Sequence, residues 1–155
     1  MPHKQYLVVL NGGSERTGGL DGRAPSVGSL ADFTERVAKA GFNIVSIGGA
    51  DSGPGSAISV LLEPDETAEE EARLRDTLNG RYRYSVADAV HLTLPDQPGV
   101  LAKLARKYAD ANISIEGIVI LDRTDGQATI SLATNNPLRA EQKAAELFSL
   151  SKSGG

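Results

Sequence analysis

The sequence contains no cysteine and no tryptophan, and aromatic residues make up only 5% of its 155 positions. Without cysteine the chain has no disulfide, no thiol nucleophile and no cysteine-ligated metal. With so few aromatic rings it lacks the stacking platform on which RNA-recognition sheets hold bases. Thiol chemistry and base stacking are therefore excluded.

Long hydrophobic runs and an excess of positive charge are also missing. The apolar run in the opening MPHKQYLVVLNGG is too short for a signal peptide, and no stretch is long enough to span a bilayer. The formal net charge of −4 disfavours nucleic acid and anionic membranes as main partners. We therefore expect a cytoplasmic protein of one ordinary domain or two small ones.

The chain does contain an internal repeat. Residues 30–47 (LADFTERVAKAGFNIVSI) align without a gap with residues 101–118 (LAKLARKYADANISIEGI), at an offset of 71 positions. Apolar positions correspond as well as identical ones, which predicts two copies of one structural unit. The identical pairs are Leu30/Leu101, Ala31/Ala102, Ala38/Ala109, Ala40/Ala111, Ile44/Ile115 and Ile47/Ile118.

Each copy predicts the same order of elements, with a strand, a helix, two strands and a second helix. The first helix carries apolar residues at helical spacing and ends at Gly41 or Asn112, residue types that tolerate a left-handed backbone. The strands are short apolar or alternating runs bounded by turn residues. We expect strands at 6–10, 42–48 and 57–62 in the first copy, and at 90–94, 113–121 and 127–133 in the second.

The second helix of each copy has its own start signal. Thr67 and Glu70 form a capping-box pattern, and Asn136 places a capping side chain before Pro137. Residues 81–86 can then close the first copy as a fourth strand. The expected class is α+β, with two ferredoxin-like βαββαβ units in tandem, at residues 1–87 and 88–155.

Two features depart from the repeat. The first copy has a loop at 12–28, rich in glycine, serine and arginine, which either closes over a site or remains solvated. The second copy ends SLSKSGG directly after its helix and lacks a final strand. Its first strand would then present an open edge, and such edges usually pair with another chain. We therefore expect at least a homodimer.

The second copy resembles an ACT domain along residues 89–147. The similarity lies in Asp96-Gln97-Pro98-Gly99-Val100-Leu101, the helix that follows, and Asn112-Ile113-Ser114-Ile115-Glu116-Gly117-Ile118. The first copy is a weaker match, because it keeps Gly41-Phe42-Asn43-Ile44 but has Pro25-Ser26-Val27-Gly28 at the turn. The resemblance implies a tandem ACT protein. ACT domains are regulatory modules that bind amino acids or other small ligands where two such domains meet.

The turn before the second copy's helix suits a small anion. Pro98 presets the backbone for a helix start, and Gly99, with no Cβ, permits close approach by a ligand or another backbone. Free N–H groups at a helix start attract a carboxylate, while Asp96 or a carbonyl of a partner domain can accept from an ammonium. The candidate ligand-binding residues are Asp96, Gln97, Pro98, Gly99, Val100, Leu101, Asn112, Ile113 and Ser114, with Gly41, Phe42, Asn43 and Ile44 of the first copy.

The same residues have a purely structural interpretation. The Asp-Gln-Pro-Gly turn can serve only as a helix start, and Asn43 and Ser114 can close a helix-to-strand turn by hydrogen bonding. His3 and His91 are isolated in the sequence, so we expect no metal site, and we place His91 on the open face of the sheet. No cofactor is expected.

These features favour a regulatory protein that binds a small-molecule effector and acts in trans on a partner, such as a regulated enzyme. The main alternative is a ligand-free assembly module that pairs through its sheet edge. An enzyme is not expected, because no catalytic triad, zinc spacing or phosphate loop is present. Acylphosphatase shares the element order, yet the loop with Arg16 and Arg23 lacks that family's glycine-glutamine-glycine pattern.

Overall fold

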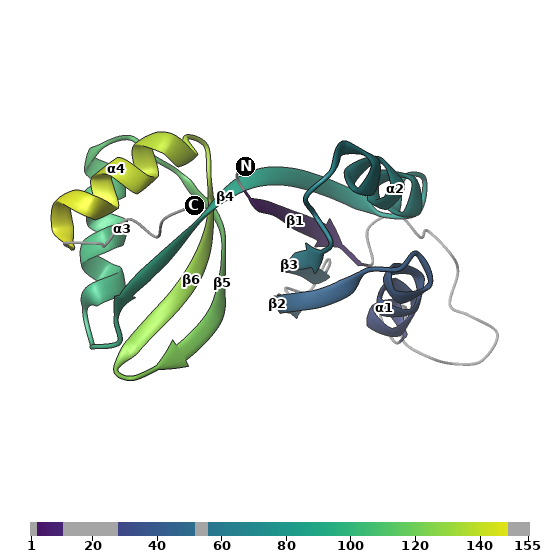
Figure 1. The fold of residues 1–155 in the computed structure, drawn as a ribbon, viewed down its shortest axis with the longest axis horizontal. Helices are drawn as coiled ribbons and strands as arrows, with labels where there is room; N and C mark the ends of the chain where they lie inside the picture. The colour runs from purple at the N-terminus through teal and green to yellow at the C-terminus, as the bar shows by residue number, and fades with distance from the viewer. Residues whose placement is uncertain (1–2, 11–27, 52–55, 149–155) are drawn as a thin grey trace. The chain divides into compact units, whose positions relative to one another are not determined.

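The computed structural model describes residues 3–10, 28–51 and 56–148. Apart from Gly28, the loop at 12–28 lies outside the described residues, and so does the tail at 149–155. The α+β class is confirmed. The described elements, in chain order, are β1 (His3–Val9), α1 (Ser29–Lys39), β2 (Asn43–Asp51), β3 (Ser56–Glu63), α2 (Ala68–Leu78), β4 (Arg83–Pro95), α3 (Val100–Asp110), β5 (Ile115–Thr124), β6 (Gln127–Thr134) and α4 (Pro137–Leu147) (Figure 1).

The chain divides into two compact units. The first unit is Tyr6–Val86, and the second unit is Ala87–Gly155 together with Met1–Gln5. The strands β1 and β4 therefore each contribute one part to the first unit and another part to the second.

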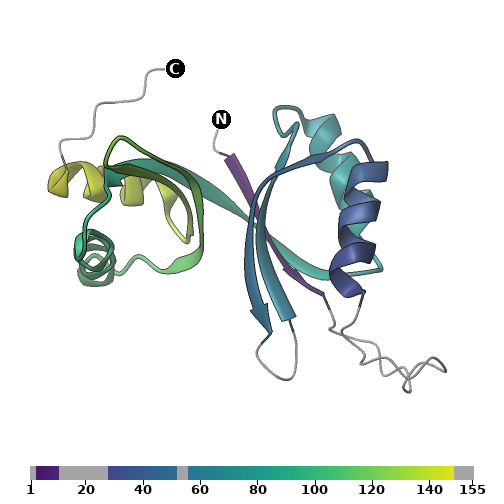
Figure 2. The same ribbon diagram turned by 90° about the horizontal axis from the view of Figure 1, so that it is seen from below.

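The first unit has the strand order β2-β3-β1-β4. The β2–β3 and β1–β3 pairs are antiparallel, and α1 and α2 cover one face of the sheet (Figure 2). Alternate residues of β1 and β3 point towards these helices, because successive side chains of a strand face opposite ways. This order is consistent with a ferredoxin-like unit. The buried core consists of Tyr6, Val8, Phe33, Val37, Phe42, Ile58, Val60, Leu62, Leu74 and Leu78.

The second unit has the strand order β5-β6-β4-β1, with antiparallel β5–β6 and β4–β6 pairs. The helices α3 and α4 lie on one face of its sheet (Figure 1). Its most buried ring is Tyr108, whose hydroxyl donates to the Ala140 carbonyl at 2.8 Å, and burial raises the pKa of this hydroxyl. The core consists of Leu92, Leu94, Val100, Leu104, Tyr108, Ile113, Ile130, Leu132, Ala140 and Ala144.

The helix signals in the sequence are confirmed. Thr67 and Glu70 form a reciprocal capping box, and the Asn136 side chain accepts from the Arg139 N–H at 3.1 Å. Gly41 and Asn112 follow α1 and α3 with φ of 89° and 56°. At both ends a pair of backbone hydrogen bonds satisfies the last carbonyls, in the arrangement known as a Schellman motif.

The open edge expected at the first strand of the second copy is not observed. In the part of the chain that the structure describes, β1 is hydrogen-bonded to β4 on that side. Residues His3–Gln5 therefore occupy the place of the missing final strand. The sequence pattern could not indicate this, because the strand comes from the other end of the chain.

Candidate functional site

The turn at 96–99 links the end of β4 to the start of α3 and is exposed, whereas Val100 is buried in the core. The Asp96 N–H donates to the Gly126 carbonyl at 2.8 Å, which fixes the turn to the β5–β6 hairpin. The Gln97 carbonyl accepts from the Val100 N–H at 3.3 Å. The turn is thus held by backbone contacts on both sides.

Gly99 begins α3 from the left-handed region, with φ 87° and ψ −10°. Gly28 begins α1 with nearly the same dihedrals, φ 89° and ψ −5°. A Cβ built on Gly99 would meet no described atom within 4 Å. Glycine is therefore required here by the backbone conformation and not by a close neighbour within the described residues. Whether a ligand approaches Gly99 stays a prediction.

The start of α3 carries N–H groups that the described residues leave unbonded. The N-cap residue has no side-chain oxygen, and the Lys103 N–H donates to the Gly99 carbonyl at 3.0 Å. Within the described chain, no hydrogen bond forms at the N–H groups of Leu101 and Ala102. Because these groups lie at the positive end of the helix dipole, they favour a negatively charged ligand.

Asp96 forms an ion pair with Arg123. Its Oδ2 accepts from Arg123, at 2.8 Å from Nη2 and 2.9 Å from Nε. Sequence reasoning missed Arg123, which arrives from the end of β5. Thr124 and Pro95 both pair with Gln127, on opposite sides of β6, so their chain neighbours Arg123 and Asp96 lie at the same end of the sheet. This register is a property of the sheet, which the sequence pattern did not provide. Asp96, which we expected to accept from an ammonium, is therefore already paired with the Arg123 guanidinium through one of its two carboxylate oxygens.

Asn112, Ile113 and Ser114 lie at the other end of α3, so the structure does not bring them to the turn within the second unit. The helix has 11 residues, which separates its ends by about 16 Å. Ile113 is part of the core. The Ser114 N–H donates to Asn135 Oδ1 at 3.0 Å, and the Ser114 carbonyl accepts from the Asn135 N–H at 3.3 Å. Asn135, also missed from the sequence, thus pairs with the backbone that leads into β5.

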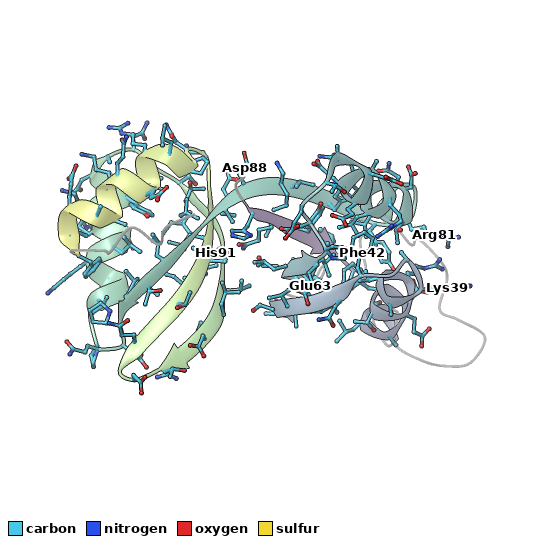
Figure 3. The ribbon with its side chains drawn as sticks, in the orientation of Figure 1. Lys39, Phe42, Glu63, Arg81, Asp88 and His91 are labelled. Atoms are coloured by element: carbon cyan, nitrogen blue, oxygen red, sulfur yellow. The ribbon has the colours of Figure 1, made fainter. Side chains whose placement is uncertain are left out.

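The corresponding residues of the first unit follow α1. Phe42 is buried, and the Arg73 guanidinium lies 4.8 Å from the centre of its ring. The Asn43 amide donates to Glu63 Oε1 at 2.9 Å, across the β2–β3 pair. Phe42 and Glu63 can be followed in Figure 3. Ile44 packs against the core and Gly41 is exposed, so Gly41 and Asn43 are the members of this set nearest to solvent.

His3 and His91 are in contact, although the sequence left them isolated. Their rings stack at 3.7 Å between centroids, with 3° between the planes. His91 pairs in register with Ser131, on the sheet face opposite to Leu92 and Leu132. Among the described residues, no group of three His, Cys, Asp or Glu side chains could hold a metal ion.

The chain is similar to known proteins in its structure and not in its sequence. No family model and no curated protein sequence matches the chain. The Bacteroides thetaiotaomicron protein BT0572 matches 97% of this chain and 90% of its own, with a TM-score of 0.63 and 19% identity. The ligand-free regulatory subunit of aspartate kinase from Thermus thermophilus matches 95% of this chain and 93% of its own, with a TM-score of 0.57 and 16% identity.

A second regulatory subunit of aspartate kinase, from Thermus flavus, matches 94% of this chain and 90% of its own, with a TM-score of 0.56 and 16% identity. The chain shares the fold of these regulatory subunits. At such low identity the similarity concerns the fold and not the ligand or the partner. Within the described ranges, no helix is long and apolar enough to cross a membrane.

Proposed function

We propose that this protein is a regulatory, tandem ACT protein that binds an amino acid or related metabolite at a contact between ACT units and acts in trans on a partner. The observation that carries the proposal is the start of α3, where the described residues leave the N–H groups of Leu101 and Ala102 unbonded, and where Asp96 of the preceding turn is paired with Arg123. The resemblance of residues 96–118 to the ACT motif supports it, as does the fold shared with regulatory subunits.

The effector's carboxylate would bind at the helix start. Two backbone N–H groups and the helix dipole stabilise an anion there. Arg123 adds a full positive charge whose planar donors suit a carboxylate. Asp96, through the oxygen that Arg123 does not hold, would accept from the effector's ammonium. Asn112–Ser114 and Gly41–Ile44 would contribute from a neighbouring ACT unit.

The first experiment is a thermal-shift screen of the amino acids and related metabolites with the purified chain. A ligand that binds only the folded state must raise stability, by about 2.7 kcal/mol at a concentration one hundred times its Kd. Calorimetric titration of each positive compound would then give its affinity. A screen in which no amino acid or metabolite raises the melting temperature would reject the proposal.

The site is tested with Arg123→Ala, and with Arg106→Ala as a matched control. Arg106 is an exposed arginine of α3 for which the described structure shows no ion pair. Loss of a charged hydrogen-bond donor should weaken binding by roughly 1.5–3 kcal/mol, while the control keeps the parent affinity. Equal affinities for the two variants would place the binding site elsewhere.

A ligand-free assembly module is the second candidate function, and the outer strands of the two units favour it. Each of β2 and β5 ends the strand order of its unit, and each carries exposed apolar residues. Ile47 in β2 is 42% exposed and Ile118 in β5 is 39% exposed. An edge strand with exposed apolar side chains is a template for pairing with another chain.

A further inference from the structure

A turn joins α2 to β4 in the first unit (Figure 1). The Leu78 carbonyl accepts from the Arg81 N–H at 3.2 Å and from the Tyr82 N–H at 3.1 Å. Between these ends lie Asn79, with φ −58° and ψ 135°, and Gly80, with φ 76°. These dihedrals and the bond from Arg81 to Leu78 identify a type II turn, whose third position requires a positive φ and favours glycine.

The step from Asn79 to Gly80 is open to solvent. Both residues are exposed, and a Cβ built on Gly80 would meet no described atom within 4 Å. In the part of the chain that the structure describes, no backbone carbonyl accepts from the Gly80 N–H. The Gly80 nitrogen is therefore neither crowded nor held by a neighbouring strand or helix.

The side chain of Asn79 is hydrogen-bonded to β4. Its Oδ1 accepts from the Tyr84 hydroxyl at 2.7 Å. A donor at a carbonyl oxygen polarises the carbonyl and stabilises the oxyanion that forms when a nucleophile adds to the carbon. The folded protein thus places a hydrogen-bond donor on the oxygen of the Asn79 side-chain amide.

A rotation of the peptide plane between Asn79 and Gly80 can bring a nucleophile to this amide. Turns of types I and II differ in the orientation of that plane, and both can keep the hydrogen bond between their first and fourth residues. Glycine at the third position accepts the φ of either type. In one sense of the rotation the Gly80 nitrogen passes beside Asn79 Cγ, and a bond between these two atoms closes a five-membered ring.

We propose that Asn79 is a self-modification site, at which the Gly80 nitrogen displaces the side-chain amide. The nitrogen loses its proton to water and bonds to Asn79 Cγ, while the Tyr84 hydroxyl donates to the developing oxyanion. The bond from Cγ to Nδ2 then breaks, ammonia leaves with a proton from water, and a succinimide remains. Water opens this ring at either carbonyl, which gives an aspartyl or an isoaspartyl residue. This inference does not depend on the proposed effector.

The reaction changes the end of α2. The new carboxylate lies directly after Leu78, where the negative end of the helix dipole disfavours it. In the isoaspartyl form the main chain also gains a methylene group, which a type II turn does not accommodate. Conversion should therefore lower the melting temperature of the protein.

The test incubates the purified full chain at neutral pH and maps its asparagines by peptide mass spectrometry, which detects the exchange of an amide for a carboxyl group. Residues 76–81 form a single tryptic peptide, separate from the one that contains the other Asn-Gly step, Asn11-Gly12. Asn112 is the internal control, because it is exposed but is followed by a branched isoleucine. A sample in urea reports the rate in the unfolded chain.

We expect Asn79 to convert in the folded chain and Asn112 to keep its amide. Tyr84→Phe should slow the conversion roughly three- to tenfold, the factor that corresponds to the loss of one hydrogen bond. Tyr82→Phe is the matched control, since it removes a hydroxyl that donates to Asp32 and should leave the rate unchanged.

Asn79→Gln tests the consequence for stability. Glutamine would have to close a larger ring, so this variant should show no conversion at position 79. Its melting temperature should stay constant during incubation, while that of the parent falls.

Two results would overturn the proposal. If Asn79 keeps its amide in the folded chain over a period in which the chain in urea converts, the fold protects the site. If Asn79 converts in Tyr84→Phe as fast as in the parent or faster, the Tyr84 hydroxyl does not stabilise the oxyanion.

Discussion

At the scale of single residues, Gly28 and Gly99 perform the same backbone task in the two units. Both begin a helix from the left-handed region, which is open to glycine and costs other residues roughly 1–2 kcal/mol. Both positions also face open space within the described residues. Strain, and not crowding, therefore decides which side chains these positions accept.

This difference between strain and crowding can be measured at position 99. Gly99→Ala should lower the free energy of unfolding by about 1 kcal/mol, because alanine resists the left-handed backbone. Gly99→Asn should lose less, although its side chain is larger, because asparagine tolerates that conformation. Urea denaturation of the three proteins gives the comparison. A larger loss for asparagine than for alanine would mean that crowding matters at this turn.

At the scale of elements, the four helices of the described structure begin in two different ways. The helices α2 and α4 have side-chain caps, from Thr67 and Asn136. The helices α1 and α3 begin at glycine and have none. A capped helix satisfies its own N–H groups, while an uncapped one leaves them for water or a ligand. The helix that carries the proposed anion site is thus one of the two that lack a cap.

The capped start of α2 should contribute to stability in a measurable way. Thr67→Ala removes the acceptor for the Glu70 N–H and should lower the free energy of unfolding by about 1 kcal/mol. Thr77→Ala is the matched control, since Thr77 lies on the same helix and bonds only to the Arg73 carbonyl in the described structure. There the better helix propensity of alanine should leave stability unchanged or slightly higher. Equal losses at both positions would contradict the capping assignment.

At the scale of the whole molecule, β2 and β5 end the strand order, so another chain can pair with either of them. If the protein assembles through β2 or β5, Ile47→Lys and Ile118→Lys should each shift the association equilibrium towards the monomer, because a buried ammonium would be unpaired in the contact. Leu138→Lys, at a residue of α4 that is 67% exposed, should leave association unchanged. Sedimentation of the three variants tests this. Unchanged association in both strand variants would remove these edges as the interface.

Local features of the fold could be predicted from the sequence because their causes are local. The left-handed residues after α1 and α3, the cap at Thr67 and the proline start of α4 each depend on residues within a few positions of one another. The apolar periodicity likewise indicated the core, and Phe33, Val37, Leu104 and Tyr108 are all buried. Of the candidate site, the sequence indicated the turn and its helix start.

The sequence by itself therefore determined the helices, their ends and the apolar faces that form each core. The tertiary structure alone decided which strand closes the second unit, and that Arg123 joins Asp96 at the turn. Ser131 and Gln5, which share a buried hydrogen bond, are 126 positions apart. Pairings over such distances depend on how strands are ordered in the sheet. That order depends on how segments far apart in the sequence pack together. No single stretch of residues encodes it.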